Sequence, residues 1–414
     1  MSVVIGIIVG LLILMLLVTG HEFGHFIAAR RNGVTVEEFG ICFPPRAIAW
    51  RKVNGKWRRL KRSEWNNPPG EGLIFSLNWL PIGGFCQMKG ESDADRRKGS
   101  FGASSFWAKT KILFAGVAMN WLMAFVILTI LAWIGMPHFL PNQFEIKSDS
   151  RAIVTQPVTI GEIKEGSPAA KANLREGDIV TQMRSLGCEE GACDAPDGER
   201  VIVSTADDLL AFDAKYAGQT IYITYERGDE TGTTEVKLNN KDAEYILGAG
   251  VSSSAVYQSS WSAPIVGFGT MVQITGETFK GVGQLIWNLI SGVVQQLNFF
   301  DQSARESGAQ AVKAAGDSVS GPVGIIGVLF PNMLSSGFSN LLFLAAIISI
   351  SLACMNVLPI PALDGGRWLL IFIYKLRRKK LTKEKEEKIV GRAFMALLII
   401  IGIVTVIDVI RMIK

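Results

Sequence analysis

Four apolar stretches separate the chain into segments of contrasting polarity. Each stretch, with its flanks, is long enough for a helix of about 20 residues, the length that crosses the hydrocarbon core of a bilayer. The stretches are Val3 to Gly20, Ile112 to Met136, Leu341 to Leu363 and Ala393 to Ile407. They predict transmembrane helices within residues 1–30, 112–136, 338–366 and 389–410.

The segments between the spans show other patterns of apolar and polar residues. Residues 31–111 alternate apolar and polar positions around Pro44-Pro45 and Gly83-Gly84, a pattern typical of short strands and turns. Leu73 to Met88 is too apolar for an ordinary loop, so we expect a membrane-reentrant β loop there. The alternative is a small amphipathic sheet on the bilayer surface. Residues 154–250 have the strand and helix pattern of a compact α+β domain.

Residues 262–298 are apolar but contain several glycines, together with Glu277 and Lys280. We interpret them as interfacial amphipathic helices, since a fifth span would invert the charge pattern downstream. Residues 299–320 are polar and rich in Ala, Gly and Ser, which predicts a linker. The fold class predicted is a polytopic α-helical membrane protein with four transmembrane helices, a membrane-associated β loop and an inserted α+β domain.

Composition and charge support this division. The chain has 414 residues, 49% of them hydrophobic, and its mean hydropathy of +0.29 is too high for a soluble protein. Residues 26–111 contain 16 Lys or Arg and 7 Asp or Glu, whereas residues 138–265 contain 11 and 20. Because basic loops stay in the cytoplasm, the acidic domain and both termini are expected on the opposite side. Basic segments beside spans need no nucleic-acid partner, and none is expected.

The five cysteines fall into two groups. Cys188 and Cys193 lie in a Gly- and acid-rich insert of the extracytoplasmic domain, where they form either a disulfide or two free thiols. Cys42, Cys86 and Cys354 fall in cytoplasmic or membrane segments, and we interpret them as small apolar residues.

A metal-binding motif ends the first span. Residues 21–25 read His21-Glu22-Phe-Gly-His25, and the i, i+4 spacing places both imidazoles on one helical face, where they can bind one Zn²⁺. Glu22 lies beside them, in the position of a general base for water. The alternative is a polar helix end at the membrane surface. Ionisable groups at membrane depth cost about 2.5 to 3.5 kcal/mol each and are usually functional, which favours the metal site.

A catalytic zinc ion usually has three protein ligands, so the motif needs a third. Asp364 is the candidate, because it is the only acidic residue in positions 318–383 and follows two helix-interrupting prolines at the end of the third span. A turn-forming Asp before Gly-Gly is the alternative. If the first and third spans run in the same direction, His25 and Asp364 lie at similar depth. Asn356 is a candidate donor to the substrate oxyanion, or else a helix-packing residue.

Five motifs occur along the chain: His21-Glu-Phe-Gly-His25, Gly83-Gly84-x-x-x-Met88-x-Gly-Glu91, Ala115-Gly116-x-x-x-Asn120, Ser320-Gly-Pro-Val-Gly-Ile325 and Asn356-x-x-Pro-x-Pro-x-x-Asp364-Gly-Gly. In this order they resemble the site-2 protease family of intramembrane zinc metalloproteases, specifically the bacterial regulator of sigma-E protease type. The resemblance covers nearly the whole chain.

The resemblance implies that His21, His25 and Asp364 bind Zn²⁺ and that Glu22 is the general base. The implied activity is cleavage within the transmembrane segments of single-span proteins, such as anti-sigma factors or remnant signal peptides. The implied location is the bacterial cytoplasmic membrane, so the partners are membrane-protein substrates and membrane lipid.

The resemblance also implies a PDZ-like fold for residues 154–250, which then either bind peptide C-termini or filter substrates by size. Val117 and Asn173 depart from the residues usual in the family, and one PDZ-like unit is present where relatives often have two. Two alternatives belong to other classes. One is a non-proteolytic membrane scaffold that binds peptide C-termini. The other is a cation transporter, against which Glu22 and the peptide-binding domain argue.

Overall fold

The computed structural model describes residues 2–70, 72–140, 142–185, 198–296 and 321–413, together with 307, 310 and 314. The chain forms two compact units. One unit contains residues 1–132 and 263–414, and the other contains residues 133–262. Cys188 and Cys193, and nearly all of the predicted linker 299–320, lie outside the described residues.

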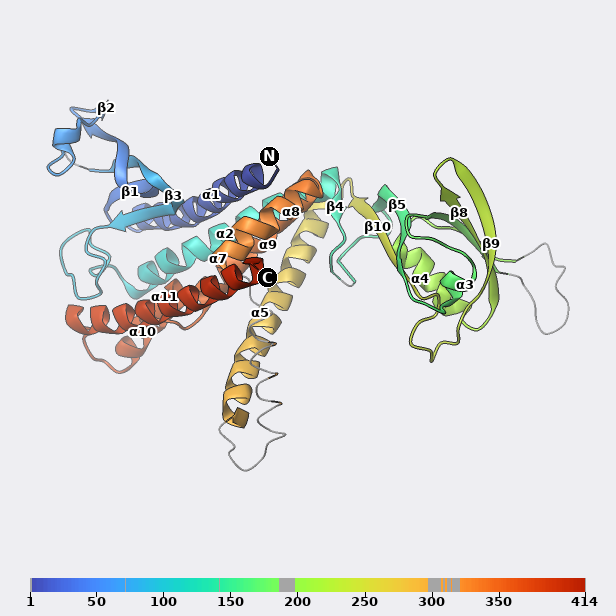
Figure 1. Cartoon of the computed structure of the whole chain (residues 1–414). Helices are drawn as coiled ribbons and strands as arrows, with labels where there is room; N and C mark the ends of the chain where they lie inside the picture. Colours follow the sequence, from blue (N-terminus) through green and yellow to red (C-terminus); the bar gives the residue numbers. More distant parts are fainter. Residues whose placement is uncertain are drawn as a thin grey trace. The chain divides into compact units, whose positions relative to one another are not determined.

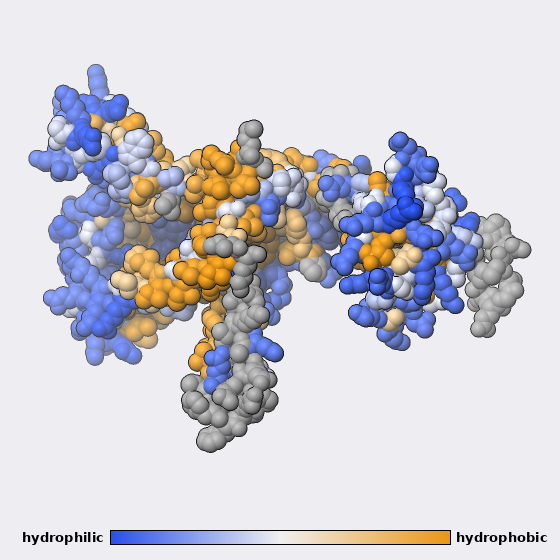
Figure 2. Space-filling model, in the orientation of Figure 1, coloured by the Kyte–Doolittle hydropathy of each residue, from blue (hydrophilic) through white to orange (hydrophobic). Residues whose placement is uncertain are grey.

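Among the described residues of the first unit, four helices are long and apolar enough to cross a membrane. Only 17% of the apolar window in the first of them, and 6% in the last, is buried inside the protein, so their outer faces need lipid around them. Figure 2 shows the apolar side chains over this unit. The prediction of a polytopic protein with four spans is confirmed. The helices are α1 (Ser2–Arg31), α2 (Phe106–Ile134), α9 (Phe338–Val357) and α11 (Lys383–Ile413) (Figure 1).

One predicted boundary and one predicted number of helices differ from the structure. The third span does not continue to residue 366, because α9 ends at Val357 and a new helix, α10 (Asp364–Leu376), begins after the two prolines. The predicted set of interfacial helices is one continuous helix, α5 (Ala263–Gln296). Its glycines weaken a helix by only about 1 kcal/mol each and therefore do not break it.

Short helical elements link α5 to α9 and pack on the first span. They are α7 (Pro322–Gly324), the π-helical turn η2 (Ile325–Leu329) and α8 (Phe330–Ser335). Gly6 and Gly10 of α1 allow this packing, because a Cβ at either position would collide with α8. Asp408 of α11 accepts hydrogen bonds from two backbone amides around the start of α7. A buried carboxylate therefore anchors these elements to the last span.

A small antiparallel sheet packs along α1. It contains β1 (Val36–Val53), β2 (Lys56–Arg59) and β3 (Ile74–Met88), with a 3-10 turn, η1 (Arg62–Glu64), between the last two. Both β1 and β3 fold back on themselves, so residues 36–41 lie between residues 74–77 and residues 84–88. Cys42 Sγ lies 3.4 Å from Met15 Sδ. The reversal of β1 therefore lies beside the middle of the first span.

The second unit is an antiparallel sheet with two short helices. Its strand order is β4-β10-β5-β6-β8-β9, with β7 paired to β6. Buried apolar residues, among them Met183, Leu209 and Ile223, form its core. The elements are β4 (Met136–Pro137), β5 (Arg151–Ile163), α3 (Pro168–Lys171), β6 (Ile179–Ser185), β7 (Arg200–Ile202), α4 (Ala206–Lys215), β8 (Thr220–Arg227), β9 (Glu230–Lys237) and β10 (Ala249–Gln258).

Candidate metal centre

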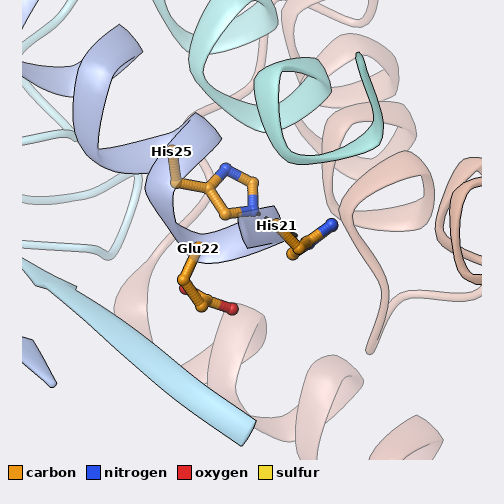
Figure 3. A group of neighbouring side chains, drawn as sticks. All are labelled: His21, Glu22 and His25. Carbon is orange, nitrogen blue, oxygen red and sulfur yellow. Dashed lines mark hydrogen bonds between the residues drawn. The ribbon is translucent and has the colours of Figure 1, made fainter. Parts of the chain in front are cut away.

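The two histidines of the motif lie one helical turn apart on α1. Their Nε2 atoms are 3.2 Å apart, and the side chains are buried, with relative exposures of 8% for His21 and 7% for His25. The two rings are nearly perpendicular, with an interplanar angle of 85°, and Figure 3 shows Glu22 projecting from the same helix. The local helix thus brings two imidazole nitrogens to one point, as the i, i+4 spacing predicts.

Asp364 completes the group from the start of α10. Its Oδ2 atom lies 3.2 Å from His21 Nε2 and 3.3 Å from His25 Nε2. The three atoms therefore form a nearly equilateral triangle. Tetrahedral zinc with ligand bonds of 2.0 to 2.1 Å separates its ligand atoms by about 3.3 to 3.4 Å, so this triangle fits zinc with one position left open.

The second ring nitrogens also fit a metal site. His25 Nδ1 lies 2.8 Å from the carbonyl oxygen of Ile112 on α2, so this nitrogen carries a proton, and in the neutral imidazole Nε2 then has the lone pair. His21 Nδ1 lies 3.2 Å from the side-chain amide of Asn120. Asn120 Oδ1 is buried without a hydrogen-bond partner among the described residues. The amide orientation that directs Oδ1 to a protonated Nδ1 satisfies this oxygen and leaves His21 Nε2 free to bind a metal.

Glu22 lies next to the triangle. One of its carboxylate oxygens is within 4.8 Å of ligand atoms on both histidines. The backbone of Cys86 in β3 lies near its carboxylate. With Asp364 as the candidate third ligand, Glu22 would be available to act on a water molecule at the open position.

Close helix packing brings α2 and α10 to the site. A Cβ at Gly116 of α2 would lie 2.6 Å from His21 Cε1 and 2.7 Å from His25 Nε2. Cβ atoms at Gly365 and Gly366 would collide with backbone carbonyls that precede α10. Glycine is therefore required at these positions by contact and not by unusual backbone angles.

A cavity of about 730 Å³ reaches Asp364 from the side of the unit that contains the loop around residue 92 and the start of α11. Charged side chains line it, including Glu91, Arg367 and Glu386. Arg367 donates to the Glu91 carbonyl oxygen, and Glu386 accepts from Ser92 Oγ at 2.8 Å. The metal-binding group therefore adjoins a polar cavity, through which water can reach it.

No role was predicted for Asn120 or Gly116, although both belong to the motif Ala115-Gly116-x-x-x-Asn120. That motif was the only available signal, because neither residue type indicates a metal site by itself. Asn356 lies half-buried near the end of α9, and among the described residues no hydrogen bond joins it to the histidines or Glu22. Its role remains a prediction.

A profile of peptidase family M50 matches residues 9–60 and 65–401. The chain therefore belongs to peptidase family M50, and the expected membership of the zinc metalloprotease class is confirmed. It is 27% identical to a proposed zinc metalloprotease of Clostridium perfringens over 98% of both chains.

Two further relatives carry more specific names. The zinc metalloprotease RasP of Bacillus licheniformis is 25% identical, and the match covers 95% of this chain and 97% of RasP. The regulator of sigma-W protease RasP of Bacillus subtilis is 24% identical, over 93% of this chain and 94% of RasP. Among solved structures, a PDZ domain of an SdrC-like protein from Listeria monocytogenes matches 24% of this chain and 90% of that domain, with 20% identity and a TM-score of 0.18.

Proposed function

We propose that this member of peptidase family M50 is an intramembrane zinc protease that hydrolyses peptide bonds within the transmembrane segments of single-span proteins. The observation that carries the proposal is the triangle of His21 Nε2, His25 Nε2 and Asp364 Oδ2, in which both histidines belong to a helix of membrane-spanning length and Asp364 begins α10. Two imidazoles and a carboxylate at these distances are the donor set of a hydrolytic zinc site.

Zinc, when bound by these three residues, supplies Lewis acidity and makes water a nucleophile near neutral pH. Glu22 accepts the proton of the attacking water and returns it to the leaving amine. Ile112 and Asn120 hold the imidazoles in the tautomer that leaves both Nε2 atoms available. Asn356 is proposed to donate its amide N–H to the developing oxyanion.

The edge of the small sheet is the proposed substrate-binding strand. Residues 84–88 pair with residues 36–41, which are their only strand partner among the described residues, and Cys86 in this edge contacts Glu22. A substrate helix must unwind before its carbonyls can react, because its own hydrogen bonds hide them. Pairing with residues 84–88 would replace those hydrogen bonds.

The charge pattern supports the proposed orientation. Basic residues dominate residues 26–111, and acidic residues dominate 138–265, so the second unit and both termini are proposed to lie outside the cytoplasm. There the PDZ-like unit would bind new C-termini or exclude large substrates. The name of the Bacillus subtilis relative, which refers to sigma-W, favours anti-sigma factors as the substrate class for this chain.

The test is cleavage of a single-span substrate by the purified full-length protein, with zinc content measured on the same samples. We expect Glu22→Gln to bind zinc without cutting and Asp364→Asn to lose both properties. Glu37→Gln, an exposed residue outside the site, should behave like wild type. If all four proteins cut equally, or none cuts while all bind zinc, the protease proposal fails and the scaffold alternative replaces it.

Substrate pairing needs a separate test. In the Glu22→Gln background, a cysteine placed in the substrate segment should form a disulfide with Gln87→Cys, because Gln87 is exposed and lies in the edge strand. Lys56→Cys, exposed in β2, is the control. Equal crosslinking to both positions would contradict the assigned edge.

A further inference from the structure

A basic surface lies on β1, β2 and η1, apart from the metal-binding group. We call residues 46–62 the basic hairpin, since they contain eight Lys or Arg and no Asp or Glu. Figure 2 shows hydrophilic side chains over the β2 end of this sheet. The basic residues are Arg46, Arg51, Lys52, Lys56, Arg58, Arg59, Lys61 and Arg62.

Three of these residues hold the hairpin together. Arg46 pairs with buried Glu38 and donates to the carbonyl oxygen of Trp65, and Arg58 pairs with Glu64 at 2.8 Å. Arg51 donates to two backbone carbonyl oxygens at the end of the following loop. Glu38 and Glu64 are thus already paired with Arg46 and Arg58 of the hairpin.

The remaining cations gather at one concavity. A cavity of about 560 Å³ is lined by Arg59, Lys61 and Arg62 and by the rings of Trp65 and Trp79. The three cationic residues are exposed, and among the described residues none forms an ion pair with an acidic side chain. This cavity therefore presents excess positive charge next to aromatic rings.

Beside this cavity, the sheet ends in an exposed apolar tip that packs near the first span. Phe43, Trp79 and Leu80 are 41%, 71% and 46% exposed, and the chain beside them contacts Met15 of α1 through Cys42. Such side chains are stable in the acyl region of a bilayer, and tryptophan is enriched at its boundary with the headgroups. Trp79 lines the cavity together with the cations, so the cavity lies where apolar surface changes to basic surface.

We propose that this cavity binds the phosphate headgroup of an anionic phospholipid. The phosphate would contact Arg59, Lys61 and Arg62, while Trp79 and its apolar neighbours would contact the glycerol and acyl regions. Continuity between the cavity and the exposed apolar tip favours lipid over a free anion. A bound lipid would fix the depth of the sheet whose other edge passes beside Glu22.

The test uses full-length protein in detergent, titrated with dioctanoyl phosphatidylglycerol and followed by native mass spectrometry. The triple variant R59Q/K61Q/R62Q should bind this lipid about tenfold more weakly or worse than wild type. The triple variant R377Q/K379Q/K380Q removes the same charge from exposed residues elsewhere and should bind like wild type. Dioctanoyl phosphatidylcholine should bind weakly to all three proteins.

Three results would overturn the proposal. They are unchanged phosphatidylglycerol binding by the R59Q triple variant, equal loss in the R377Q control, and displacement of the lipid by an equal concentration of inorganic phosphate. The last result would assign the cavity to a free anion. If the triple variant does not fold, as judged by its thermal unfolding midpoint, the single variant R59Q tests the proposal in its place. It should weaken phosphatidylglycerol binding about threefold.

Discussion

Asn120 Nδ2 lies 3.2 Å from Nδ1 of His21, although 99 positions separate the two residues in the chain. The Asn120 backbone carbonyl accepts a hydrogen bond of 2.8 Å from Ser349 Oγ of α9, so Asn120 lies between the first and third spans. One buried amide residue thus connects a proposed zinc ligand to the helix that leads to Asp364. The interaction sets both the tautomer and the orientation of the His21 ring.

Replacing Asn120 should weaken metal binding without unfolding the protein. In the amide orientation that turns Oδ1 toward His21, Asn120→Ala removes the acceptor for His21 Nδ1–H, and loss of such a partner typically costs 10- to 100-fold in metal affinity. Competition with a chromogenic zinc chelator measures this change. Asn120→Asp keeps an acceptor of the same shape and should restore most of the affinity. Equal zinc affinity in Asn120→Ala and wild type would show that the contact is only helix packing.

Gly116→Ala should displace the imidazoles. The added Cβ would lie within 2.7 Å of atoms in both rings, so the triangle must open and both zinc content and cleavage should fall at least about tenfold. Gly391→Ala is the matched control, because nothing lies within 4 Å of a Cβ at this α11 position. That control should retain activity and gain roughly 0.5 to 1 kcal/mol of stability from helix propensity. Full zinc occupancy in Gly116→Ala would refute the packing argument.

Glu386→Gln should loosen the contact between α11 and the loop at the mouth of the polar cavity. Buried Glu386 accepts hydrogen bonds of 2.8 Å from Ser92 Oγ and from the backbone amide of Asp93. Loss of its charge should lower the free energy of opening this contact by about 1 to 3 kcal/mol. Hydrogen exchange at the Asp93 amide should accelerate accordingly. Glu387→Gln, whose exposed partner Lys383 lies 3.7 Å away, should change stability by less than about 0.5 kcal/mol. Equal effects of the two variants would show that Glu386 does not hold α11 to this loop.

The second unit should lose stability as pH rises, because of Asp213. Burial raises the pKa of this carboxyl from 3.8 to about 7, and its Oδ1 has no hydrogen-bond partner among the described residues. The folded state therefore binds more protons than the unfolded state between about pH 4 and pH 7. Stability should fall across that window, by at most roughly 4 kcal/mol, and level off above it.

Hydrogen exchange of the α4 amides in the full-length protein, measured from pH 5.5 to 8, checks this prediction. After correction for intrinsic exchange rates, protection in wild type should decrease toward pH 7. Asp213→Asn cannot ionise, so its protection should stay nearly constant and exceed that of wild type at pH 8. Parallel pH profiles for the two proteins would show that Asp213 is not buried in the neutral form.

Much of this protein could be predicted from local sequence. A run of apolar side chains requires lipid or a protein interior wherever it lies, so the spans could be found without knowing their neighbours. His21 and His25 could also be predicted to face the same point, because the geometry of one helix turn depends only on spacing. The end of α9 was misplaced, since the prolines indicated an interruption but not the residue at which the next helix begins.

Only the tertiary structure decided the parts of the site that depend on contacts between helices. Asp364 could be suggested as a ligand from its isolation in an apolar region, but its distance to the imidazoles depends on how α10 folds back against α9. Asn120 and Gly116 gained roles only when α2 was seen to pack within contact distance of His21. Sequence alone determined which segments enter the membrane, because hydrophobic burial is a local property of composition. Packing determined the candidate metal centre, because hydrogen bonds and distances of about 3 Å between candidate ligands require the relative positions of helices that are far apart in the chain.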